Sequence, residues 1–201
     1  MKKILLLGII ILSVFIIYLT TLDKKVYYVS LGDQIALGIT KEGYYEKNYT
    51  DYIKEYLEKN KILETCINEY QTQGYRITDI INDINNNKEI EETGKTIKNS
   101  LIKADLLTIS IGTNDITSKI DETKKLTKID YNKIKKNIDT IIKDLDNLLK
   151  LIREYCKEDI IMIGININTY ENLLKNKIYP TKEEYQKIGE EIIKEMNLLK
   201  K

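Results

Sequence analysis

The sequence contains no histidine and only two cysteines in 201 residues. The lack of imidazole excludes every mechanism that needs a histidine base from this chain, and every metal site that includes histidine. Cys66 and Cys156 are too few for a disulfide framework or a cysteine-rich zinc site. We therefore expect neither a metal nor a cofactor.

The sequence also lacks an excess of positive or negative charge. Lysine and arginine total 32 against 31 acidic residues, and the two signs alternate along the chain. Interleaved charge is typical of solvated helix faces, and no basic block or mixture of basic and aromatic residues indicates RNA or DNA binding. A nucleic-acid partner is therefore not expected.

An almost uninterrupted apolar run covers residues 4–19, after Lys2 and Lys3. This pattern predicts an export signal. The run is slightly shorter than the roughly 20 residues of a spanning helix, but no small-residue cleavage site follows it. We favour an uncleaved signal anchor that forms an N-terminal hydrophobic helix, with a cleaved signal peptide as the alternative.

The export signal divides the chain into a membrane segment, residues 1–25, and a domain, residues 26–201. The short amino-terminal tail favours a single-pass protein of the cell membrane, with its domain outside the cytoplasm. Cleavage would instead release a secreted domain.

Strands and helices alternate after the leader. Buried strands are predicted at 26–31, 62–68, 106–111 and 159–165, and helices at 48–61, 76–84, 89–103, 129–155 and after Pro180. The alternation predicts an α/β fold, a flavodoxin-like three-layer α/β/α sandwich around a parallel sheet. We expect the strand order 2-1-3-4, which separates Cys66 and Cys156 by three strand spacings of about 4.8 Å. Both thiols should therefore be free and mostly buried, because bridging needs less than about 7 Å.

The first strand ends in a turn bounded by two glycines, residues 32–38, at the carboxyl edge of the sheet. Open α/β sheets have their ligand-binding and catalytic sites at this edge. Gln34 stands at the centre of the turn, where a nucleophile would be expected. Two further loops, 71–75 and 112–115, also follow strands and can face this turn.

These three segments, together with residues 176–180 before the last helix, resemble the conserved blocks of the SGNH (GDSL) hydrolases, mostly esterases, lipases and acyl hydrolases. Residues 31–38 look like the first block, 74–79 like the second, 112–115 like the third and 176–180 like the last. The resemblance implies the SGNH-hydrolase fold for the whole domain.

The resemblance also implies which residues stand at the catalytic positions. Gln34 occupies the place of the nucleophilic serine, Asn176 that of the orienting aspartate and Tyr179 that of the histidine base. All three triad positions are substituted, and neither an amide nor a phenol with a pKa near 10 replaces the lost pair at neutral pH. Ser30 and three threonines nearby lack a histidine to activate them.

The oxyanion contacts implied by the resemblance are retained. They are the backbone N–H groups of Gln34 and Gly74 and the side-chain amide of Asn114. Asp33, Asp115 and Arg76 are the supporting candidates: Asp33 as an acceptor that stabilises the turn, and Arg76 as either an anion-binding or a solvated residue.

The leading interpretation is a catalytically inactive pseudo-esterase that acts in binding or interaction at the cell envelope. Its candidate partners, besides the membrane, are a carbohydrate, an acyl ligand or an active partner protein. The alternative is an active ester or acyl hydrolase with a non-standard site, in which a water attacks with Asp33 or Asp115 as base.

Overall fold

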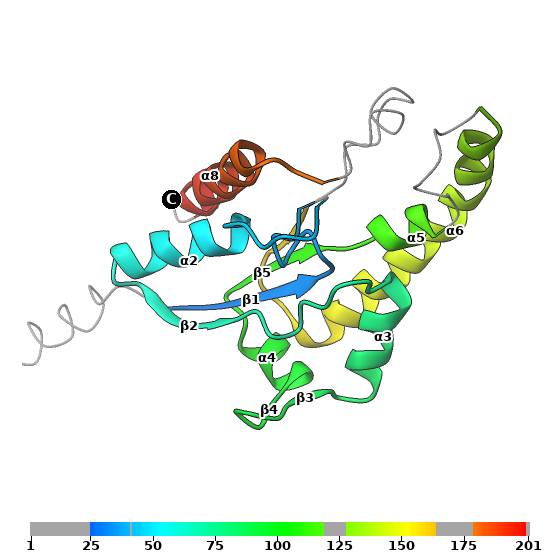
Figure 1. Cartoon of the computed structure of the whole chain (residues 1–201). Helices are drawn as coiled ribbons and strands as arrows, with labels where there is room; N and C mark the ends of the chain where they lie inside the picture. Colours follow the sequence, from blue (N-terminus) through cyan, green and yellow to red (C-terminus); the bar gives the residue numbers. More distant parts are fainter. Residues whose placement is uncertain (1–24, 41, 119–127, 164–178, 200–201) are drawn as a thin grey trace, which may run out of the picture.

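The computed structural model describes residues 25–40, 42–118, 128–163 and 179–199, which form a mixed α/β fold (Figure 1). The strands are β1 (Val26–Gly32), β2 (Leu63–Ile67), β3 (Glu89–Ile90), β4 (Lys95–Thr96), β5 (Leu106–Ser110) and β6 (Ile160–Met162). The helices are α2 (Tyr49–Lys59), α3 (Ile77–Asn85), α4 (Ile97–Lys103), α5 (Thr113–Thr117), α6 (Lys128–Tyr155) and α8 (Lys182–Leu199).

The main sheet has four parallel strands in the order β2-β1-β5-β6. This is the order predicted from the alternation of strands and helices. β1 lies inside the sheet and is buried along its whole length, because it pairs on both sides and is covered on both faces. Its register with β5 runs from Tyr28 opposite Leu106 to Gly32 opposite Ser110, so the two strands end together.

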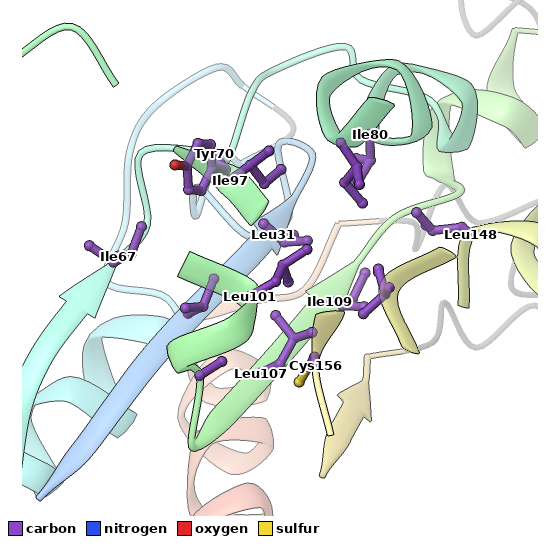
Figure 2. Close-up of a cluster of buried hydrophobic side chains, with 14 of the residues drawn as sticks. Leu31, Ile67, Tyr70, Ile80, Ile97, Leu101, Leu107, Ile109, Leu148 and Cys156 are labelled. Carbon is purple, nitrogen blue, oxygen red and sulfur yellow. The ribbon is translucent and has the colours of Figure 1, made fainter. Parts of the chain in front are cut away.

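Helices cover both faces of the sheet. Figure 1 shows α2 and α8 together over one face, and α3, α4 and α6 over the other. Side chains alternate along β1, so Tyr28 joins the first layer, whereas Val29 and Leu31 join the second. Figure 2 shows the second layer, where Leu31 and Ile109 from neighbouring strands meet Ile80 of α3 and Leu148 of α6.

The segment 89–103 differs from the expected helix. Its first part forms an antiparallel hairpin of β3 and β4, and only Ile97–Lys103 is helical. Gly94 closes the hairpin turn with a φ of 65°, a left-handed conformation that glycine adopts without strain. The prediction of a helix was therefore wrong for residues 89–96, because the glycine was read as part of a polar helix.

Both cysteines are free in the structure, as predicted. Cys156 is buried beside β5, whereas Cys66 on β2 is half-buried, and burial raises the pKa of the Cys66 thiol to about 11. Among the described helices, none has both the length and the hydropathy of a membrane span. The predicted N-terminal hydrophobic helix lies outside the described residues.

Candidate functional site

The carboxyl edge of the sheet brings the three predicted loops to one place. The N–H of Asp33 donates to the carbonyl of Ser110 at the end of β5, 3.0 Å away. On the other side of β1, the N–H of Thr72 donates to the carbonyl of Gly32 at 2.9 Å. These two bonds fix the turn after β1 between the loop that carries Gly74 and the segment that carries Asn114.

Gly32 makes this close approach sterically feasible. A Cβ atom added to it would lie 2.3 Å from the carbonyl oxygen of Ser110 and 2.8 Å from the Cβ of Ala36. A side chain at this position would therefore push the turn away from β5. The glycine is needed because two backbone segments pass each other here.

The side chains of Gln34 and Asn114 form a reciprocal pair. Gln34 Nε2 donates to Asn114 Oδ1 at 3.1 Å, and Asn114 Nδ2 donates to Gln34 Oε1 at 2.9 Å. Gln34 Oε1 also accepts the backbone N–H of Gly74 at 3.3 Å, and Asn114 Nδ2 also donates to the carbonyl of Tyr75 at 2.7 Å. We call these four residues the amide cluster.

Backbone groups fix the orientation of both carboxamides in the amide cluster. The N–H of Gly74 can only donate, so Gln34 must turn its oxygen toward it. The carbonyl of Tyr75 can only accept, so Asn114 must turn its nitrogen toward it. With both orientations set in this way, each contact between the two side chains pairs a donor with an acceptor.

The structure thus joins the three residues for which the resemblance implies oxyanion contacts. Gln34 is 4 % exposed and uses its own carbonyl oxygen to accept the Gly74 N–H and the Asn114 amide. The sequence pattern could bring the three positions together, but it did not predict that the Gln34 side chain would occupy the donors.

Asp33 stabilises the turn. Its Oδ1 accepts the N–H of Ile35 at 3.0 Å, and its carboxyl is buried. Burial raises the pKa of Asp33 to about 6, against the opposing effect of the Ile35 N–H. The carboxyl is fully buried, so it is not placed to activate a water from the solvent.

Asp115 of α5 contacts the start of α3, which Arg76 directly precedes. Asp115 Oδ2 accepts the N–H of Ile77 at 3.2 Å, which satisfies one of the free donors at the helix terminus. Burial raises the pKa of Asp115, and the nearby Arg76 opposes this shift. Arg76 is exposed and its backbone N–H donates to Asp79. Their visible role is to anchor α3 beside the amide cluster.

The last predicted block is only partly described. Asn176 lies outside the described residues. Tyr179 is half-buried ahead of α8, and its proximity contributes to the raised pKa of Tyr185, whose main cause is burial. The capping box predicted for this helix is present, with reciprocal bonds between Thr181 and Glu184.

A buried polar network beneath the turn was not predicted from the sequence. Gln71 Nε2 donates to the hydroxyls of Ser30 and Thr50, at 2.8 and 3.1 Å, and the hydroxyl of Thr108 donates to Ser30 at 3.0 Å. Tyr28 completes the network through Thr108. A signal existed in the sequence, because Ser30 and Thr108 are polar residues at paired positions inside two mostly apolar strands.

The network also determines what Ser30 can do. Its hydroxyl is fully buried and engaged with three side chains, so it is not presented to a substrate. Thr113 and Thr117 are buried as well. Within the described ranges, no three histidine, cysteine or acidic side chains are grouped in a way that could hold a metal ion.

The solved structures to which the chain is similar include several esterases and lipases. The acetylxylan esterase Axe2 from Geobacillus stearothermophilus is 17 % identical, with a TM-score of 0.49 over 87 % of this chain and 75 % of that one. An extracellular lipase from Streptomyces rimosus is 17 % identical, with a TM-score of 0.49 over 68 % of this chain and 58 % of that one. A lipase/acylhydrolase from Enterococcus faecalis is 20 % identical, with a TM-score of 0.40 over 87 % of this chain and 73 % of that one.

No protein of curated function matches the sequence. A family model does: the model for GDSL-like lipases and acylhydrolases matches residues 28–198, which is nearly the whole domain expected from the sequence. The match agrees with the resemblance drawn from the four blocks. The chain therefore belongs to the GDSL-like lipase/acylhydrolase family.

Proposed function

We propose that this protein is a catalytically inactive member of its family that acts by binding or interaction at the cell envelope. The observation that carries the proposal is the position of Gln34. The resemblance assigns Gln34 to the nucleophile's place, and its carboxamide accepts the hydrogen bonds of Gly74 and Asn114. A carboxamide is not a nucleophile for acyl transfer, and the chain holds no histidine to activate a water or a hydroxyl.

The surroundings support the same conclusion. Ser30 is buried and bonded beneath the turn, and Asp33 is fully buried. Asp115, the remaining candidate base, accepts the N–H of Ile77 with its Oδ2 and so caps the start of α3. These positions support the absence, among the residues that the structure describes, of a group placed to activate a water against a bound ester.

An ester-hydrolysis assay tests the proposal. The full-length chain, purified in detergent, is incubated with short acyl esters such as p-nitrophenyl acetate, beside the variants Asp33→Asn and Asp115→Asn. We expect the same rate with all three proteins as with detergent buffer alone. Turnover by the wild type that either substitution abolishes would instead establish the alternative, an active hydrolase with a carboxylate base.

The proposed location rests on the apolar run at residues 4–19, which supports a single-pass anchor with the domain outside the cytoplasm. In that setting, the candidate partners are an envelope carbohydrate, an acyl ligand or an active partner protein.

Membrane fractionation with protease added to intact cells tests the location. We expect the protein in the membrane fraction and its domain cleaved by the external protease. A protease-resistant domain or a freely secreted one would contradict the anchor.

A further inference from the structure

The two hydrogen-bond donors that face the Gln34 carboxamide, the N–H of Gly74 and the side-chain amide of Asn114, are both engaged. Asn114 Nδ2 has two hydrogens, of which one bonds to Gln34 Oε1 and the other to the carbonyl of Tyr75. The N–H of Gly74 is taken by the same Gln34 oxygen. A carbonyl from another molecule can therefore reach these donors only after the Gln34 side chain has left.

The amide cluster also presents an acceptor. Asn114 Oδ1 faces Gln34 and receives a hydrogen from Gln34 Nε2. It cannot exchange places with Asn114 Nδ2, because the Tyr75 carbonyl needs a donor. Any group that replaces Gln34 thus meets two donors and one acceptor, arranged for a C=O and an N–H on the same carbon.

We propose that the Gly74 N–H and the Asn114 carboxamide form a binding site for a primary carboxamide, which the side chain of Gln34 occupies in cis. This rests on the proposed function, because a site filled by its own side chain does not turn over esters. The selectivity follows from Asn114 Oδ1. An ester or a carboxylate places an oxygen where the cluster needs an N–H, so two acceptors face each other without a hydrogen between them.

The occupancy in cis makes the wild type a weak binder of any added ligand. An external amide replaces one set of hydrogen bonds with an equal set, while Gln34 remains tethered beside the site. The apparent affinity equals the intrinsic affinity multiplied by the fraction of time that the site is open. If Gln34 is withdrawn for about one tenth of the time or less, the wild type binds at least about tenfold more weakly than a variant without this side chain.

NMR titration of the full-length chain in detergent micelles tests the proposal, with acetamide and sodium acetate as probes. Acetamide carries the same functional group as the end of the glutamine side chain, whereas acetate lacks the N–H. The signals to follow are the backbone amide of Gly74 and the side-chain NH₂ of Asn114. The variants are Gln34→Ala, to empty the site, and Gln34→Ala with Asn114→Ala, to remove its acceptor and one donor. Gln34→Ser replaces Gln34→Ala if the latter does not fold.

We expect acetamide to shift both signals in Gln34→Ala, with an affinity about tenfold higher than that of acetate, because one matched hydrogen bond is worth about that ratio. The double variant should lose this preference. The wild type should show no saturable shift with either probe, and this part of the experiment does not depend on the folding of a variant.

Ester turnover by the wild type would refute the proposed function yet leave the preference for acetamide over acetate measurable. Equal binding of acetate and acetamide by the emptied site, or tight acetamide binding by the wild type, would overturn the carboxamide site itself.

Discussion

Gln34 and Asn114 exchange two hydrogen bonds through their side-chain carboxamides, at 3.1 and 2.9 Å, across 80 residues of sequence. One side chain belongs to the turn after β1 and the other to α5, which follows β5. The pair thus ties together the carboxyl ends of two neighbouring strands.

The pair should be energetically coupled. A double-mutant cycle with Gln34→Ala and Asn114→Ala should give a coupling of about 1–2 kcal/mol. Either single substitution already removes the two hydrogen bonds that the pair shares, so the double variant cannot lose them again. Urea unfolding of the full-length chain measures it. A matched cycle combines Asn114→Ala with Lys54→Ala. Lys54 is exposed on α2, so this cycle should show no coupling. Additive effects in the first cycle would mean that the two side chains are not paired in solution.

Stability should depend on the protonation of Asp33. Its pKa is raised from 3.8 to about 6 in the folded protein, so the folded state binds more protons than the unfolded state between these values. The free energy of unfolding should therefore fall as pH rises from about 4 to about 6, by roughly 3 kcal/mol for this group alone. Asp33→Asn keeps an oxygen for the Ile35 N–H and should remove this loss.

Urea unfolding at several pH values checks this prediction, with Glu58→Gln on the exposed side of α2 as the control. We expect Asp33→Asn to be more stable than the wild type at pH 7.5 and to be no more stable at pH 4. The same pH profile in both proteins would show that Asp33 is not desolvated in the way its burial indicates.

Two glycines of the site should respond differently to alanine. At Gly32, the new Cβ would lie 2.3 Å from the Ser110 carbonyl, so we expect a loss of roughly 3–5 kcal/mol from overpacking and backbone strain. At Gly74, φ is 83° but no atom lies within 4 Å of an added Cβ, so we expect only the cost of the left-handed conformation, about 1–2 kcal/mol. Thermal and urea unfolding of both variants measure the difference. Equal losses would contradict the close approach of the turn to β5.

The buried polar network makes Ser30 a structural residue. Ser30→Ala should destabilise the domain by roughly 1–3 kcal/mol, because the amide of Gln71 and the hydroxyl of Thr108 lose a partner in a buried place. Ser118→Ala, an exposed position, should change stability by less than about 0.5 kcal/mol. A neutral Ser30→Ala would mean that other groups satisfy the network.

Much of the fold was predictable from the sequence because apolar strands and striped helices report burial directly. β1 and β5 were recognisable as runs buried on both faces, and their positions led to the strand order that the structure has. The hairpin of β3 and β4 was missed since each of these strands has two residues, too few to show a period of two.

The candidate site was predictable only in part. The spacing of the motifs brought Gln34, Gly74 and Asn114 to one edge of the sheet, because parallel strands end together. It could not reveal the direction of the Gln34 side chain, which depends on the Gly74 N–H and the Tyr75 carbonyl that fix both carboxamides. Likewise, Gln71 was read as a loop residue, although its side chain turns inward to the hydroxyl network.

Hydrogen exchange of the side-chain carboxamides tests the central claim most directly. In the wild-type chain, the NH₂ groups of Gln34 and Asn114 should exchange at least about tenfold more slowly than that of Gln73, which is exposed in the neighbouring loop. This result would show that Gln34 occupies the donors of the amide cluster in solution. Exchange of Gln34 as fast as that of Gln73 would show that the site is open and would contradict the account.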